Sequence, residues 1–208
     1  LSGLVSVAML LNHGSVWLQL KTDGKLQNRA RSVSVVLSLL TAALFALAGI
    51  YLAVGVDGYV ITSEIDTFAT SNPMTKEVAI ESGAWLQNYS KYPWMIIAPI
   101  LGIAGALACA ALSKVNRSGF AFVASALSIA GIILTAGFSM FPFLMPSSTV
   151  PAVSLTVWDA TSSYLTLKIM FGVACVLVPV ILAYTTYSFY VMRGRIKEAD
   201  LNQSHTIY

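Results

Sequence analysis

Few residues of this sequence could carry chemistry, and histidine is among the scarcest of them. The chain has 208 residues, with two histidines and two cysteines. His13 lies in an apolar stretch, where a histidine could ligate haem, relay a proton, contact a quinone or form a hydrogen bond between helices. No nucleophile–base pair, zinc spacing or phosphate loop is visible. We therefore expect no catalytic residue and no metal ligand, and keep His13 as the candidate for a cofactor contact.

The composition places the chain in a lipid bilayer. Hydrophobic residues make up 57% of it and charged residues only 10%, and its mean hydropathy is +0.76. An ordinary soluble domain carries about 25% charged residues. A soluble enzyme, a disordered chain and a nucleic-acid binder are therefore excluded. Cys109 and Cys175 both lie in apolar stretches, which predicts small buried side chains rather than a disulfide.

Five stretches are long and apolar enough to cross a membrane, which predicts an all-α, polytopic membrane protein with a helical-bundle core. We expect one membrane domain over 1–208, two folded outer loops at 58–92 and 142–163, and a tail at 193–208. The expected spans are 1–20, 33–54, 93–112, 119–141 and 165–192. Because the sequence opens at Leu1 inside an apolar run, we expect it to be the C-terminal portion of a longer subunit.

Lysine and arginine indicate the orientation of these spans. If the chain alternates across the bilayer, one side carries most of the basic residues. The opposite loops carry only Lys76 and Lys91, and Lys168 lies near the start of the last span. Cytoplasmic loops are enriched in lysine and arginine, so the basic side and the C-terminus are predicted to be cytoplasmic. The basic side comprises Lys21, Lys25, Arg29, Arg31, Lys114, Arg117, Arg193, Arg195 and Lys197.

Local signals predict details of the outer loops. Asn72 followed by Pro73 is typical of a helix start, and we expect a helix over 73–88. Gly58 is expected in a left-handed turn after the second span, and Asp159 is expected to cap the last helix. The segment 142–163 is rich in proline and too apolar for a free aqueous loop, so we expect it to pack against protein.

Helix packing is predicted from small residues and prolines. Pro99 and Pro179 are expected to kink the third and fifth spans. A short turn over 113–117 predicts an antiparallel hairpin of the third and fourth spans. Small residues at helical spacing predict close helix contacts: Ala42, Ala46 and Gly49 in the second span, Gly102, Gly105 and Cys109 in the third, and Ser125, Ser128 and Gly131 in the fourth.

Two blocks, Met140–Thr149 (MFPFLMPSST) and Ser154–Ser163 (SLTVWDATSS), resemble subunit II of the cytochrome bd-type quinol oxidases. Shorter matches are Gly55–Tyr59, Ser71–Pro73, Gly83–Trp85 and the chain end from Met192. Together they extend along the whole chain. Subunit II of that family has about nine membrane helices, and this sequence resembles the last five.

The resemblance implies a bacterial inner-membrane complex that oxidises quinol and reduces dioxygen to water. It implies two b-type haems and one d-type haem in the partner, subunit I, and none ligated by this chain. Subunit II would assemble with the haem subunit in lipid, without nucleic acid, and could hold a structural quinone. We expect the segment 142–163 to dock on subunit I, with Phe141, Phe143, Trp158 and Asp159 as subunit-interface candidates. The alternative is a fragment of a secondary transporter with proline-kinked helices.

Overall fold

The computed structural model describes residues 1–64, 72–191 and 194. It contains five helices long and apolar enough to span a membrane, which confirms the prediction of an all-α polytopic membrane protein. They are α1 (Ser2–Lys21), α2 (Gly24–Gly55), α4 (Ile97–Lys114) with the preceding turn η3 (Pro93–Ile96), α5 (Ser118–Met140) and α7 (Tyr164–Val191). The division into one membrane domain with the expected loop boundaries stays a prediction.

The second helix begins earlier than expected. Helix α2 starts at Gly24 rather than near residue 33, so Lys25, Arg29 and Arg31 lie in its first turns. No proline interrupts 24–33, and leucine, glutamine, arginine and alanine favour a helix. Most of the predicted tail, including Arg193, Arg195 and Lys197, lies outside the described residues.

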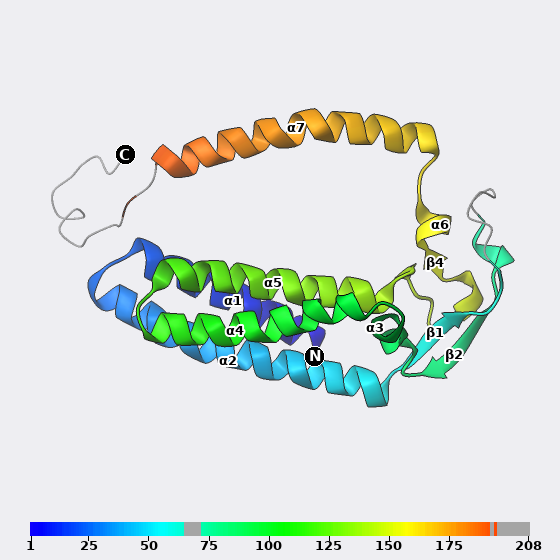
Figure 1. The fold of residues 1–208 in the computed structure, drawn as a ribbon, viewed down its shortest axis with the longest axis horizontal. Helices are drawn as coiled ribbons and strands as arrows, with labels where there is room; N and C mark the ends of the chain where they lie inside the picture. The colour runs from blue at the N-terminus through cyan, green and yellow to red at the C-terminus, as the bar shows by residue number, and fades with distance from the viewer. Residues whose placement is uncertain (65–71, 192–193, 195–208) are drawn as a thin grey trace.

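Helices α1, α2, α4 and α5 form a four-helix bundle (Figure 1). Val115–Arg117 joins α4 to α5, and Asn116 adopts a left-handed conformation there with φ 61°. The predicted antiparallel hairpin is therefore confirmed. The end of α1, the start of α2, the end of α4 and the start of α5 meet at this side of the bundle (Figure 1). These helix ends carry Lys21, Lys25, Lys114 and Arg117, so we call this side the basic end.

Close backbone contact holds α4 against α5. A Cβ atom on Gly105 would lie 2.8 Å from Ser128 N, and one on Gly131 would clash with Gly102 N. The Ser128 hydroxyl donates to Gly102 O at 2.7 Å. These contacts confirm the small-residue prediction for this helix pair. A Cβ atom on Gly49 of α2, in contrast, would meet no described atom within 4 Å, so the close helix contact expected at Gly49 stays a prediction.

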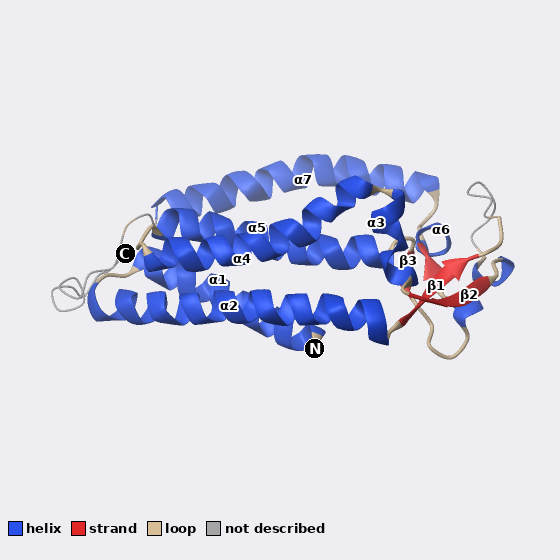
Figure 2. Cartoon of the chain, turned by 60° about the horizontal axis from the view of Figure 1, so that its bottom comes forward, coloured by secondary structure: helices blue, strands red, loops and turns tan. Residues whose placement is uncertain are grey.

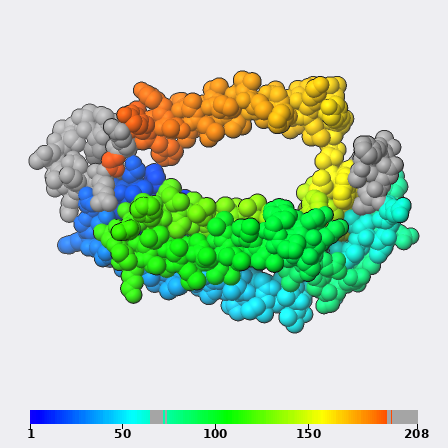
Figure 3. Space-filling view, in the orientation of Figure 1, coloured from blue at the N-terminus to red at the C-terminus, as the bar shows by residue number. Residues whose placement is uncertain are grey.

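Helix α7 stands apart from the bundle, and an opening lies between them (Figures 1 and 3). None of its 28 residues is buried, although Trp17 of α1 and Phe189 of α7 have ring centroids 5.8 Å apart. Cys109 is buried as predicted, but Cys175 is exposed because α7 has no covering helix in the described chain. Pro179 lies inside α7, whereas Pro99 falls in the first turn of α4, where a helix tolerates proline.

A small mixed layer caps the end of the bundle opposite the basic end (Figure 2). It contains two antiparallel strand pairs and five short helices or turns. The strands are β1 (Asp57–Ile61) with β2 (Val78–Ser82), and β3 (Phe143–Met145) with β4 (Leu155–Thr156). The short elements are η1 (Pro73–Thr75), η2 (Ala84–Leu86), α3 (Gln87–Lys91), η4 (Pro151–Val153) and α6 (Val157–Ala160). We call this the outer layer.

The helix expected over 73–88 is wrong. The Asn72 side chain does accept from Met74 N at 3.0 Å, but only the single turn η1 follows. Residues 78–82 pair with β1 instead, with Ile80 opposite Tyr59. Valine and isoleucine favour strands, and long-range pairing overrides the local helix-start signal here.

Gly58 is not in a left-handed turn, so that expectation is also wrong. It lies in β1, and a Cβ atom there would lie 2.6 Å from Trp85 N and 2.7 Å from Ala84 Cβ. The position therefore requires glycine for close backbone approach, not for a positive φ.

Candidate functional site in the outer layer and bundle

Aromatic residues of the outer layer line an open hollow of about 740 Å³ beside the end of α5. Tyr59 and Trp85 have ring centroids 5.5 Å apart, and each lies 6.0 Å from the ring of Phe143. Phe141 and Trp158 form a second ring pair at 6.4 Å. The cluster joins the loop after α2 to the segment between α5 and α7, which are distant in sequence.

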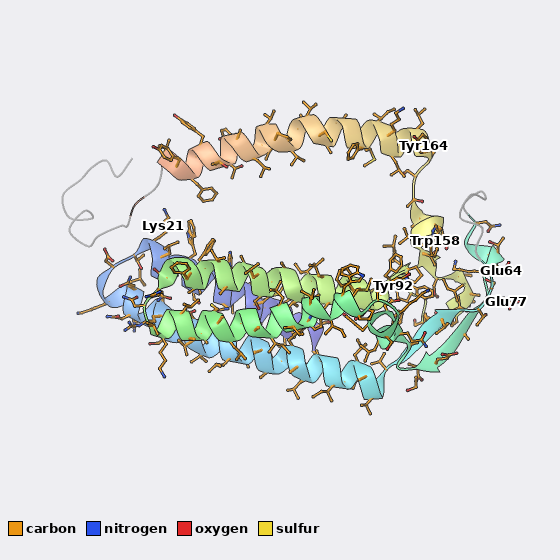
Figure 4. All side chains as sticks on the ribbon, in the orientation of Figure 1. Lys21, Glu64, Glu77, Tyr92, Trp158 and Tyr164 are labelled. Carbon is orange, nitrogen blue, oxygen red and sulfur yellow. The ribbon has the colours of Figure 1, made fainter. Side chains whose placement is uncertain are left out.

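The predicted interface residues gather in this layer, but they differ in exposure. Phe143 is only 4% exposed, so its side chain supports the layer from within. Phe141 is 44% exposed and Trp158 is half-buried. Figure 4 shows Trp158 on the segment that leads to α7. Phe141 and Trp158 are thus the two candidates that another protein could contact directly.

Asp159 is the charged centre of the layer. Its Oδ2 accepts from Lys76 Nζ at 2.6 Å, from Thr156 Oγ1 at 2.6 Å and from Thr156 N at 3.1 Å. The Lys76 and Asp159 side chains are 5% and 11% exposed. Burial alone would raise the pKa of Asp159, but the hydrogen bonds from Lys76 and Thr156 outweigh it and lower that pKa.

These contacts correct the predicted role of Asp159. It does not cap the last helix. It forms a capping box with Thr156 at the start of α6, four residues long, because Thr156 and Asp159 are spaced as N-cap and N3. The partner Lys76 comes from a loop far away in sequence, so no local pattern could have indicated it.

His13 forms a hydrogen bond between helices. Its Nδ1 lies 2.8 Å from Ser125 Oγ of α5, and Ser125 donates its own proton to Phe122 O at 2.8 Å. His13 Nδ1 is therefore the donor of this pair. The Phe122 ring lies 4.6 Å from the imidazole, and no group of three or more His, Cys, Asp or Glu residues that could hold a metal occurs in the described chain. Because this hydrogen bond occupies Nδ1 alone, the role of His13 in a cofactor contact stays a prediction.

A cluster of buried polar side chains lies inside the bundle and was missed by the sequence reasoning. We call it the polar core. The Asn12 Oδ1 atom accepts from Ser38 at 2.9 Å and from Ser34 at 3.3 Å. The sequence did carry a signal for this cluster: Asn12 and Gln19 are seven residues apart on α1, so the two polar side chains lie on the same face of that helix. The polar core consists of Asn12, Gln19, Ser34, Ser38, Cys109 and Ser113, each at most 3% exposed.

Comparison with known proteins agrees with the resemblance drawn from the sequence. A family model described as "Cytochrome bd terminal oxidase subunit II" matches residues 1–192. The "Probable cytochrome oxidase subunit 2" of Haemophilus influenzae is 50% identical over 100% of this chain and 55% of its own length. The "Cytochrome bd-I ubiquinol oxidase subunit 2" of Escherichia coli is 47% identical over the same shares. A Bacillus subtilis relative, "Cytochrome bd ubiquinol oxidase subunit 2", is 27% identical over 96% of the chain and 51% of its own length. The chain spans about half the length of these relatives.

Proposed function

Because this chain belongs to the cytochrome bd terminal oxidase subunit II family, we propose that it serves in a complex that oxidises quinol and reduces dioxygen to water. Its part is assembly: it packs against the haem-bearing subunit I and is not catalytic alone. The two b-type haems and the d-type haem are assigned to that partner. The scarcity of histidine supports this division of roles, since His13 is the one histidine in the part of the chain that the structure describes.

The separation of α7 from the bundle is the observation that carries this proposal. A helix of 28 residues with none buried, held off the bundle by a folded outer layer, leaves room for other membrane helices. We propose that helices of the oxidase complex lie beside α7. The exposed Phe141 and the half-buried Trp158 lie where the chain enters α7 and would extend the same contact.

The arrangement of charges supports a bacterial inner-membrane orientation. Lys21, Lys25, Lys114 and Arg117 gather at the basic end, while Glu64, Glu77 and Asp159 lie in the outer layer. The excess of basic residues belongs to cytoplasmic loops. We therefore propose that the basic end and the C-terminus face the cytoplasm.

Removal of the two accessible aromatic side chains tests the assembly role. The double variant Phe141→Ala and Trp158→Ala should reduce the amount of haem subunit that co-purifies with a tagged subunit II. Phe120→Ala is the matched control, since Phe120 is 65% exposed on α5 at the basic end. Full recovery of a haem-loaded, quinol-oxidising complex from the double variant would contradict the docking role. A colourless preparation of the unaltered protein would favour the transporter alternative.

We extend the proposal to a structural quinone held by this subunit. The uncovered apolar surface of α7 suits an isoprenoid tail, which needs apolar contact rather than hydrogen bonds. Solvent extraction of the purified complex should release more quinone per haem than extraction of subunit I alone. Equal quinone content in the two preparations would contradict this extension.

A further inference from the structure

The polar core at the basic end has an unsatisfied group that points to a ligand. We propose that it binds water at Gln19, and that it forms a polar recess of hydrogen-bonded side chains that exchanges protons with this water at the basic end and stops at Asn12. This inference concerns the four bundle helices alone and does not rest on the proposed oxidase role.

The Gln19 side chain is fully buried, yet only its nitrogen is paired. Nε2 donates to Ser113 O at 3.3 Å and lies 3.5 Å from Asn116 Oδ1. Oε1 is the one buried side-chain N or O atom without a partner among the residues that the structure describes. Turning the Gln19 amide by 180° would place its oxygen against two acceptor atoms, Ser113 O and Asn116 Oδ1. The unpaired atom is therefore the carbonyl oxygen and not the amide nitrogen. A buried amide oxygen requires a donor, and water supplies one.

The same site is loosely held and close to solvent. Both contacts of Gln19 Nε2 are longer than the usual 2.9–3.0 Å of such hydrogen bonds. Its neighbour Asn116 is exposed, and the partly exposed Gln27 donates to Gln19 O at 3.2 Å. Gln19 thus lies under polar side chains at the surface of the basic end, through which water can enter.

From Gln19 a continuous series of polar groups leads into the bundle. Ser113, whose carbonyl accepts from Gln19, has its hydroxyl 3.0 Å from that of Ser34. Ser34 donates to Asn12 Oδ1, so the Ser34 oxygen is left to accept the Ser113 proton. Asn12 Nδ2 lies 3.7 Å from Cys109 Sγ at the inner end. At 1.5 Å per residue, Asn12 lies about 14 Å along α1 from Lys21, near the middle of the span.

Tight backbone packing closes the recess beyond Asn12. Nearer the outer layer, α4 and α5 meet through Gly102 and Gly131, and a Cβ atom on Gly131 would not fit against Gly102. The Ser128 hydroxyl there already donates to Gly102 O. Beside Cys109 lie the buried apolar residues Val16, Ala121 and Ala124. Water bound at Gln19 is therefore linked through hydrogen-bonded side chains to Asn12 at mid-membrane depth, and this series does not cross to the other side.

Cys109 offers a native reporter at the inner end of the recess. The S–H stretching band that is lost in Cys109→Ser identifies its thiol in infrared spectra of the membrane-embedded complex. On transfer to D2O, this thiol should exchange while the bundle amides remain protected. Gln19→Leu removes the water site and should slow that exchange severalfold, because the series then has no bound water at its outer end. Thr135→Ala is the control, since Thr135 bonds to Gly131 O away from the recess.

Two results would overturn the proposal. The recess is excluded if the Cys109 thiol keeps its original hydrogen in D2O for as long as the bundle amides keep theirs. It is also excluded if Gln19→Leu leaves the exchange rate of this thiol unchanged. An experimental density map of the unaltered complex tests the water site without any variant. Density within hydrogen-bonding distance of Gln19 Oε1 supports the site, and empty space there refutes it.

Discussion

Breaking the ion pair between Lys76 and Asp159 should open the outer layer. The two side chains are 5% and 11% exposed and their charged atoms lie 2.6 Å apart. An exposed pair is worth about 0.2–1 kcal/mol, whereas removing one partner of a buried pair costs about 3–5 kcal/mol. With exposures this low we expect a cost of about 3 kcal/mol for Lys76→Met, which leaves the Asp159 carboxylate without its counter-ion.

Hydrogen exchange measures this cost locally, because the opening free energy sets the exchange rate of protected amides. Val157 N donates to Pro142 O at 2.9 Å and reports on the segment that Asp159 holds. A loss of about 3 kcal/mol should accelerate exchange of this amide roughly a hundredfold. The double variant Lys76→Met with Asp159→Asn removes both charges and should exchange more slowly than Lys76→Met alone. If Val157 exchanges at the same rate in Lys76→Met and the unaltered protein, the pair does not hold the layer.

Three further predictions concern the stability of the outer layer at low pH, the packing of α4 against α5, and the role of His13. Because the pKa of Asp159 is lowered in the folded protein, its carboxylate should stabilise the outer layer fully above the ordinary pKa of 3.8, and this stabilisation should be lost as the pH falls through the lowered pKa. Protection of the Val157 amide should fall over the same pH range, and Asp159→Asn should lack this loss. Gly131→Ala should clash with α4 and cost several kcal/mol, seen as lost yield of folded complex, whereas Gly137→Ala, with open space around it, should fold normally. His13→Phe should leave the haem absorption bands of the complex unchanged, and a lost band would show that His13 ligates haem.

The sequence predicted the membrane helices well because their signal is strong and local. A run of about 20 apolar residues suffices to span a bilayer, and all five spans were found. The α4–α5 hairpin was also predictable, since a short turn leaves no other arrangement. Only the start of α2 was misplaced, because charged helix formers such as Arg29 and Arg31 continue a helix beyond the membrane.

The outer layer was less predictable because long-range pairing decides it. Residues 73–88 carry a valid helix start at Asn72, yet β2 pairs with β1 from the other side of the loop. Gly58 was assigned to a turn because glycine usually signals one, but Trp85 is the neighbour that requires it. The interface role of Phe141, Phe143, Trp158 and Asp159 stays a prediction. Their different exposures depend on partners that sequence spacing does not identify.

The outer layer sets the position of α7. In lipid, burial of apolar surface gives no net drive for helices to associate, so they need close backbone contact or polar contacts. The bundle has both, in the Gly102–Gly131 contact and in the polar core. Helix α7 has no buried residue, and Gly172 in its interior has no atom near enough to meet a Cβ. Its place beside the bundle therefore depends on the ring contact between Trp17 and Phe189 and on its covalent link to α6, which Lys76 and Asp159 fix to the loop after β1. Loosening that pair should release α7 as well as the outer layer.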